Sequence, residues 1–223
     1  MTEKWPTPRD VIWAFRVVGY LVRGARYVAK GRYDQALADY DRAIELSPDH
    51  ASGFMGRGNT YYAMGRYDQA LADYDRAIEL DAAYGPAIAG RGETYRKMER
   101  YDDALADFDR AIELGAVATS TSTAGVFIGR GATYRDMGRY DQALADFDRA
   151  IELGAANAEA FAARGTIYRA MGRYDQALAD YDRAIELDPA EDEFAAARTA
   201  ICLLTGRSDT DHAVPDNRGT KAT

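Results

Sequence analysis

A pattern of apolar and polar positions recurs five times along the chain with little change. Its first copy covers residues 31–46 and reads GRYDQALADYDRAIEL, and the later copies begin at Gly65, Glu99, Gly138 and Gly172. The starts of successive copies are 34, 34, 39 and 34 residues apart. A fixed period of this length is typical of a solenoid, in which stacked units bury apolar faces that one unit cannot bury alone.

The repeated segment has the apolar spacing of a helix. In its first copy, Ala36, Tyr40 and Ala43 fall on a single helical face. The glycine that begins it, Gly31, allows the left-handed residue that ends the preceding helix sharply. Glu99 takes this place in the third copy, so we expect a strained or differently shaped turn there.

A second helical pattern precedes every copy of this segment. An aromatic residue or Ile is followed after four residues by Gly and after three more by Tyr, which places all three on one face. In the second unit these residues are Phe54, Gly58 and Tyr61. Each unit is therefore predicted to be a pair of helices whose backbones approach closely at Gly and Ala, while aromatic rings fill the space around them.

This order of residues over one period resembles the tetratricopeptide repeat, a helix-turn-helix unit that stacks into a right-handed superhelix. The second unit matches the signature positions of that family at Phe54, Gly58, Tyr61, Gly65, Tyr67, Ala70, Tyr74 and Ala77. The resemblance covers residues 17–191 and implies an all-α, right-handed superhelical solenoid of helix-turn-helix repeats with a C-terminal capping helix.

The landmarks divide the chain into five units and four further segments. The units are predicted at residues 17–50, 51–84, 85–118, 124–157 and 158–191. A Ser- and Thr-rich loop insertion at 119–123 accounts for the longer third spacing. Residues 1–16 are expected to extend the first helix, 192–205 to form the capping helix, and 206–223 to be a disordered tail.

An Arg precedes the first-helix Gly in all five units, where the family usually has Leu. These residues are Arg23, Arg57, Arg91, Arg130 and Arg164. Because they recur in every unit, we expect them to stabilise the unit itself, by pairing with an Asp such as Asp39 and its equivalents, rather than to bind one ligand.

The composition offers few of the residues that catalytic sites use. The chain has one cysteine, Cys202, and two histidines, His50 and His212, and its glycines recur at helix crossings and turns rather than in a phosphate-binding loop. The carboxylates repeat along a solvated helix face, where acid-base pairs are not expected. We therefore predict a protein that is not an enzyme and uses no cofactor or metal, and we expect it in the cytoplasm, because a single cysteine suits a reducing compartment.

The apolar run VIWAFRVVGYLV at residues 11–22 contains Arg16 and is shorter than the roughly 20 residues that a spanning helix needs. We interpret it as part of the first helix. The net charge of −8 argues against attraction of the whole surface to nucleic acid or anionic lipid, although a local basic patch is compatible with it. We expect neither nucleic acid nor a membrane as the partner. The alternative that stays open is self-association through residues 8–22, or membrane-associated assembly through this helix.

The resemblance implies that function lies where the copies differ, because in this family the first helices line a concave groove that binds a partner protein or peptide. The groove residues predicted from this implication are Leu21, Met55, Asn59, Tyr62, Glu93, Arg96, Lys97, Ile128, Arg135, Asp136, Thr166 and Arg169. One end is mainly apolar, whereas Arg96, Arg135 and Arg169 occupy the same place in three consecutive units. The prediction is a protein-interaction scaffold whose partner segment is apolar at one end and acidic or phosphorylated at the other.

Overall fold

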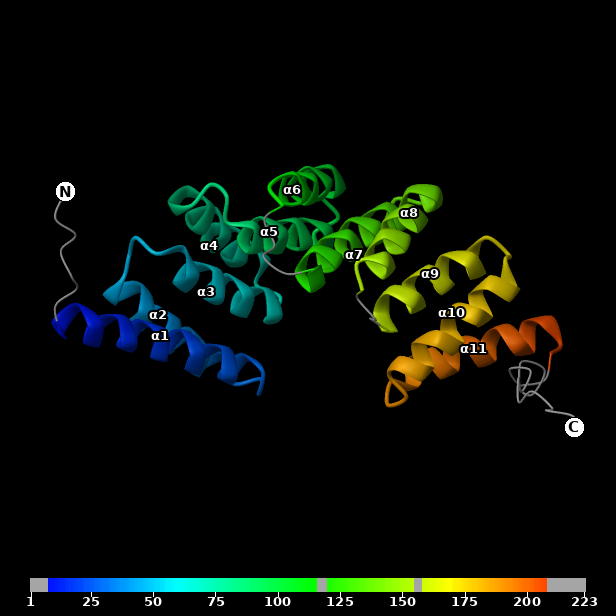
Figure 1. Cartoon of the computed structure of the whole chain (residues 1–223), viewed down its shortest axis with the longest axis horizontal. Coiled ribbons are helices and arrows are strands. Elements are labelled where there is room, and N and C mark those ends of the chain that lie inside the picture. Colours follow the sequence, from blue (N-terminus) through cyan, green and yellow to red (C-terminus); the bar gives the residue numbers. More distant parts are fainter. Residues whose placement is uncertain (1–7, 116–119, 155–157, 208–223) are drawn as a thin grey trace, which may run out of the picture.

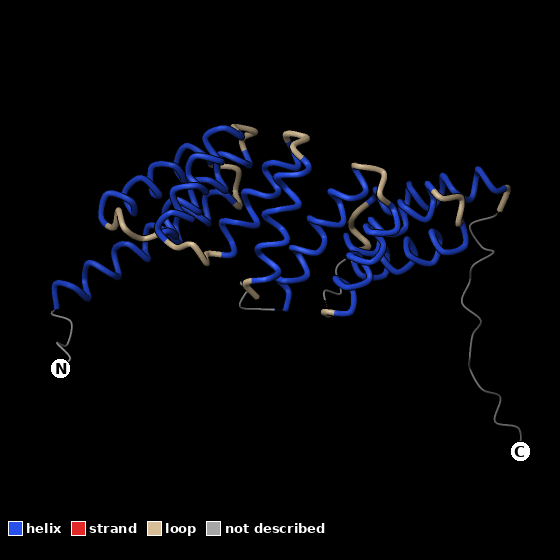
Figure 2. The backbone as a smooth tube through the Cα atoms, turned by 90° about the horizontal axis from the view of Figure 1, so that it is seen from above, coloured by secondary structure: helices blue, strands red, loops and turns tan. Residues whose placement is uncertain are grey.

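The computed structural model describes residues 8–115, 120–154 and 158–207, and these ranges contain eleven helices and no strand. Consecutive helices form helix-turn-helix pairs that stack side by side into an elongated, curved array, with α1 at one end and α11 at the other (Figure 1). The view from above shows the same succession of pairs (Figure 2). The predicted all-α solenoid is confirmed.

The helices alternate between the two positions of a unit. The first helices are α1 (Pro8–Val28), α3 (Ala51–Ala63), α5 (Gly85–Lys97), α7 (Ser120–Asp136) and α9 (Ala158–Ala170). The second helices are α2 (Tyr33–Leu46), α4 (Tyr67–Leu80), α6 (Tyr101–Glu113), α8 (Tyr140–Glu152) and α10 (Tyr174–Leu187). Each second helix packs against both its own first helix and the next, and α11 (Asp192–Thr205) covers α10 at the C-terminal end.

The predicted helix at 192–205 is α11, and it continues the repeat register as the first helix of a sixth unit. Its Arg198 lies one 34-residue period after Arg164. Gly206 then adopts a left-handed φ of 70°, and the Arg207 N–H donates to the Cys202 carbonyl at 2.9 Å, which repeats the turn of the complete units. The period therefore runs to residue 207, past the boundary that we expected between capping helix and tail, while residues 208–223 lie outside the described part of the chain.

The turn within each unit keeps one geometry even where the glycine is replaced. Gly65 and its equivalents have φ values of 67–73°, and Glu99 has a φ of 58°. The Arg100 N–H donates to the Tyr95 carbonyl at 2.9 Å, as in the glycine-containing turns. Of the two alternatives expected for this turn, the structure shows the strained one and not a different shape. The strain is present, because a left-handed residue with a Cβ costs about 1–2 kcal/mol.

The insertion before the fourth unit is not a loop over its whole length. Ser120 to Thr123 form the first turn of α7, so the predicted loop at 119–123 is wrong for these four residues. Residues 116–119 lie outside the described ranges. Ser and Thr are tolerated in the first turn of a helix, where backbone N–H groups have no partner within the helix, and a Ser- and Thr-rich composition therefore did not distinguish this turn from a loop.

The core is built from aromatic rings clamped between small residues. The ring of Tyr40, which is 5% exposed, lies between Gly24 of its own unit and Gly56 of the next, and a Cβ at Gly56 would lie 2.3 Å from the Tyr40 Cε1 atom. Tyr74 and Phe108 are held in the same way by the glycines of adjoining first helices. Each ring thereby joins two first helices to one second helix.

The recurrent Arg residues pair with Asp as expected. Within each unit, the guanidinium binds both oxygens of a buried Asp through Nε and Nη2 at 2.5–2.9 Å. These pairs are Arg23–Asp39, Arg57–Asp73, Arg91–Asp107, Arg130–Asp146 and Arg164–Asp180.

A second contact of the same Arg residues connects neighbouring units. Nη1 of each Arg from the second unit to the fifth binds an Asp of the preceding unit at 2.6 Å, and Arg198 of α11 binds Asp182 through Nε at 2.5 Å. The other four cross-unit pairs are Arg57–Asp41, Arg91–Asp75, Arg130–Asp109 and Arg164–Asp148. We call the whole set of intra-unit and cross-unit pairs the Arg–Asp ladder.

The clamp around Tyr40 predicts that one added methyl group destabilises the array. Gly56→Ala should lower the free energy of unfolding by about 1–3 kcal/mol, because the ring has to move out of its position. Gly19→Ala is the matched control. No neighbouring atom lies within 4 Å of a Cβ at Gly19, so the better helix propensity of Ala should raise stability by up to about 1 kcal/mol. Urea denaturation followed by circular dichroism measures both, and equal stability of the two variants would contradict the clamp.

Candidate functional site

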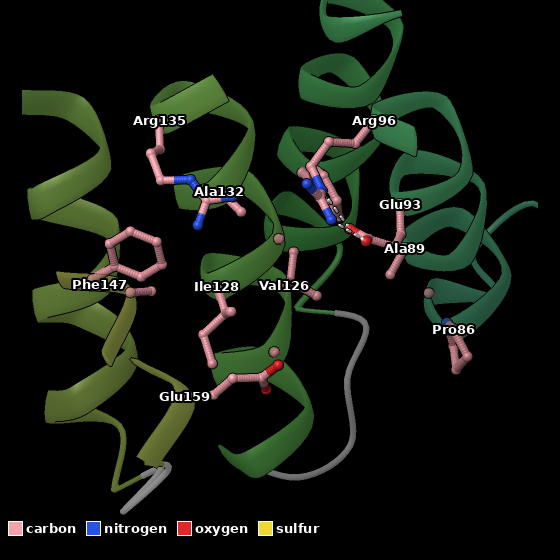
Figure 3. Close-up of a pocket in the computed structure, with 15 residues that line it drawn as sticks. Pro86, Ala89, Glu93, Arg96, Val126, Ile128, Ala132, Arg135, Phe147 and Glu159 are labelled. Carbon is pink, nitrogen blue, oxygen red and sulfur yellow. Dashed lines mark hydrogen bonds and ion pairs between the residues drawn. The ribbon is translucent and has the colours of Figure 1, made fainter. Parts of the chain in front are cut away.

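Two adjoining cavities lie on the side of the array formed by the first helices. The first has a volume of about 550 Å³ and is lined by α5, α7 and α9, and the second, also about 550 Å³, is lined chiefly by α9 and α11. Figure 3 shows the first cavity, with side chains of α5 and α7 facing each other across it. Arg135, Glu159 and Ala163 line both cavities. We call this continuous depression from α5 to α11 the C-terminal groove.

Small residues and buried rings form the floor of the C-terminal groove. The first helices contribute Ala89, Ala132 and Ala163, and the rings of Phe108 and Phe147 reach the floor from the second helices α6 and α8. The rings reach it because small residues leave room between neighbouring first helices. The rings that stabilise the array thus also form an apolar floor for the first cavity.

Charged residues form a network at the rim of the first cavity. Arg96 on α5 binds Glu93 through Nε and Nη2 at 3.0 and 2.6 Å, and its Nη1 reaches Asp136 on α7 at 2.7 Å. Arg135 binds the other oxygen of Asp136 at 2.8 Å, and the Tyr62 hydroxyl donates to Glu93 at 3.1 Å. Two guanidinium groups therefore balance two carboxylates within this network.

The network also sets the protonation of its members. Partial burial raises the pKa of Asp136, but hydrogen bonds from Arg135 and Arg96 outweigh it and leave the pKa below its ordinary value of 3.8. The hydrogen bond to Glu93 raises the pKa of Arg96 against the opposing effect of its burial. Asp136 and Arg96 therefore both stay charged. The Arg96 side chain is only 13% exposed.

The three Arg residues at equivalent groove positions are consequently not equivalent in charge. Arg96 and Arg135 are bound by carboxylates, whereas Arg169 is exposed, lines the second cavity and pairs with no carboxylate among the described residues. The predicted row of basic residues thus leaves one uncompensated cation, at the α9 end.

The structure brings half of the predicted groove residues together around the two cavities. Those lining them are Glu93, Arg96, Ile128, Arg135, Thr166 and Arg169. Those lining neither are Leu21, Met55, Asn59, Tyr62, Lys97 and Asp136.

Two of the predicted groove residues bind the hydroxyl groups of buried tyrosines in the second helices. Asn59 accepts a hydrogen bond of 2.6 Å from the Tyr74 hydroxyl, and the Thr166 hydroxyl lies 2.9 Å from that of Tyr181. The two units with Phe at the corresponding ring position have Glu93 and Ala132 instead at the position of Asn59. Part of the sequence variation among the first helices is therefore explained by the aromatic ring of the second helix that packs against each position, without reference to a ligand.

Sequence reasoning missed the contribution of α11 to the groove. Glu193, Phe194, Ala197 and Ala200 line the second cavity. The spacing of 34 residues between Arg164 and Arg198 would have predicted these groove positions, because it extends the register of the first helices into α11.

Neither metal binding nor membrane crossing is indicated within the described ranges. No three His, Cys, Asp or Glu side chains come together there as a metal site requires. No helix of the described chain combines the length and apolar character needed to cross a bilayer.

Comparison with known families matches most of the chain to repeat models. A model described as TPR repeat matches residues 24–65, one described as tetratricopeptide repeat matches 51–84 and 158–190, and another with the same description matches 86–156. No sequence match was found among curated proteins.

Several solved structures share the architecture. TTC0263, a thermophilic TPR protein of Thermus thermophilus, is 24% identical, with 84% of this chain and 99% of that chain covered at a TM-score of 0.72. PilW, a type IV pilus biogenesis factor, is 15% identical over 86% and 87% of the two chains, with a TM-score of 0.78. YrrB, a TPR protein with an unusual peptide-binding site, is 25% identical over 82% and 92%, with a TM-score of 0.57.

The rim network predicts a pH-dependent contribution from Asp136. Asp136→Asn should lower the free energy of unfolding by about 1 kcal/mol near neutral pH. Because the pKa of Asp136 is depressed in the folded state, this difference between wild type and variant is present above pH 3.8 and is lost as the pH falls through the folded-state pKa. Urea denaturation between about pH 7 and pH 3 measures it.

The control for this measurement is Asp49→Asn, in an exposed turn, which should change stability near neutral pH by less than about 0.5 kcal/mol. A deficit of Asp136→Asn that stays constant over the whole pH range would contradict an electrostatic role for the network.

Proposed function

The chain belongs to the tetratricopeptide repeat family, and we propose that it is a non-catalytic adaptor that binds an extended segment of a partner protein in the C-terminal groove. The observation that carries this proposal is the continuity of two cavities of about 550 Å³ along four successive first helices. An extended chain advances about 3.3 Å per residue and packed helices lie about 8–10 Å apart, so about every third side chain of a segment lying across these helices meets the next unit.

The geometry favours binding without a large ordering cost. The Arg–Asp ladder holds each described unit against its neighbour, so the groove walls are in place before a ligand arrives. A preformed site avoids much of the conformational entropy that a flexible surface loses on binding. The peptide-binding site of YrrB, on the same fold, supports this use of the array.

The charge distribution determines which part of the ligand is acidic. The carboxylates bound to Arg96 and Arg135 leave those residues little capacity for a further anion, whereas Arg169 is exposed. We therefore assign an acidic ligand side chain to Arg169 and small apolar side chains to the floor around Ala132. Glu193 also lines the second cavity, which favours a singly charged carboxylate over a phosphate because repulsion grows with ligand charge.

A cytoplasmic location is part of the same proposal. Cys202 is buried and has a free thiol. A lone reduced cysteine is what a reducing compartment permits.

Peptides selected on the wild-type protein from a random library provide the probe for the groove. Arg169→Ala should weaken the binding of the selected acidic peptides about three- to tenfold, as expected for one partly exposed ion pair, with an unchanged melting temperature. Fluorescence anisotropy measures the affinity. Arg183→Ala is the matched control, because Arg183 is a comparably exposed Arg on α10 and pairs locally with Glu186; it should bind as the wild type does.

A second variant tests the apolar floor. Ala132→Arg places a long side chain inside the first cavity and should abolish binding of the same peptides, while circular dichroism confirms that the helices are retained. Wild-type affinity in both Ala132→Arg and Arg169→Ala would exclude the C-terminal groove as the binding site.

A further inference from the structure

Helix α1 differs from the other first helices at the positions that would face a preceding unit. Val22 stands where the second, third and fourth units have Gly56, Gly90 and Gly129. Arg26 stands where the later first helices have a fully buried Thr or Ile. These buried residues are Thr60, Thr94, Thr133, Ile167 and Ile201.

Val22 and Arg26 prevent a further repeat from packing against α1. A single Cβ at Gly56 would already lie 2.3 Å from the ring of Tyr40, so the branched side chain of Val22 would occupy the space that such a ring needs. Arg26 would have to be buried without a carboxylate at the position of a threonine, which is costly for a charged group. Head-to-tail stacking with a second copy, by the contacts used inside the array, is therefore excluded at this end.

The outer face of α1 instead carries an apolar stripe beside cations. Phe15, Val18 and Val22 are 75%, 54% and 55% exposed, and their spacing of three and four residues aligns them on one side of the helix. Arg26 and Lys30 continue from this stripe toward the C-terminal end of α1 and are exposed. Figure 1 shows α1 at the N-terminal edge of the array, with none of the other described helices on its outer side.

The charge of this region is opposite to that of the whole protein. Residues 11–33 contain five Arg or Lys and no Asp or Glu, whereas the complete chain has a net charge of −8. Arg23, Arg26, Lys30 and Arg32 surround a small cavity of about 260 Å³ at the end of α1. Among the described residues, Arg23 binds Asp39 through Nε and Nη2, and its Nη1 has no cross-unit Asp of the kind that the later units contain.

We propose that the outer face of α1, formed by Phe15, Val18, Val22, Arg26 and Lys30, docks on an anionic membrane surface. A helix lying in the plane of the interface buries its apolar side chains at the boundary between headgroups and acyl chains, while its cations contact lipid phosphates. The exposed apolar stripe favours lipid over an acidic protein, because ion pairing alone does not require it. The net negative charge of the rest of the chain orients the protein with α1 toward the membrane.

Vesicle flotation with the full-length protein tests this proposal. We expect binding to phosphatidylcholine vesicles containing phosphatidylglycerol, little binding to pure phosphatidylcholine vesicles, and a steep decrease with added salt. The double variant R26Q/K30Q should bind the anionic vesicles at least tenfold more weakly. F15S/V18S, which keeps every cation, should also bind more weakly, because the apolar contribution is lost.

The matched control is R76Q/R183Q, which removes the same two charges from exposed positions on α4 and α10 and should bind as the wild type does. Absence of binding to anionic vesicles, or equal binding of R26Q/K30Q and R76Q/R183Q, would overturn the proposal. The proposal would also be overturned if R26Q/K30Q weakened binding and F15S/V18S did not. The cations would then indicate an acidic protein as the partner of this face.

Discussion

The Arg–Asp ladder is the interaction on which the rest of the structure depends. In each of the second to fifth units, one guanidinium binds the buried Asp of its own second helix and an Asp of the preceding second helix. Lys could not replace Arg here, since a point charge cannot form the two parallel hydrogen bonds of the fork and a third contact as well. A buried ion pair adds little net stability. We therefore assign the ladder to fixing the register of each unit against its neighbour.

That register gives the aromatic clamps a second role. The rings of Phe108 and Phe147 fit between small residues only if adjacent first helices keep their spacing, and the same rings then form the floor of the C-terminal groove. The near-identical second helices therefore supply the ladder and the floor. The variable first helices supply the rim, so the array separates residues that maintain its geometry from residues that distinguish one part of the groove from another.

The sequence predicted what depends on local or periodic contacts. Helix pairs, turns at glycine and the pairing of Arg23 with Asp39 all follow from spacing within one period. The ion pair of Arg96 with Asp136 could not be predicted in this way, because Asp136 lies 40 residues away on another helix. The turn at Glu99 kept its shape because the helices on both sides outweigh the strain of one residue. The helix at 192–205 was predicted, but its register as a sixth first helix was not, because no copy of the repeated segment follows it.

We thus propose two binding faces on one scaffold: the C-terminal groove for a protein segment and the outer face of α1 for an anionic membrane surface. The most direct test of the central assignment is nuclear magnetic resonance of alanine methyl groups during titration with a selected peptide. The account predicts shifts at Ala132 and Ala163 in the groove and none at Ala70 and Ala143, which lie buried in the second helices. Shifts at Ala70 and Ala143 without shifts at the groove methyls would contradict it.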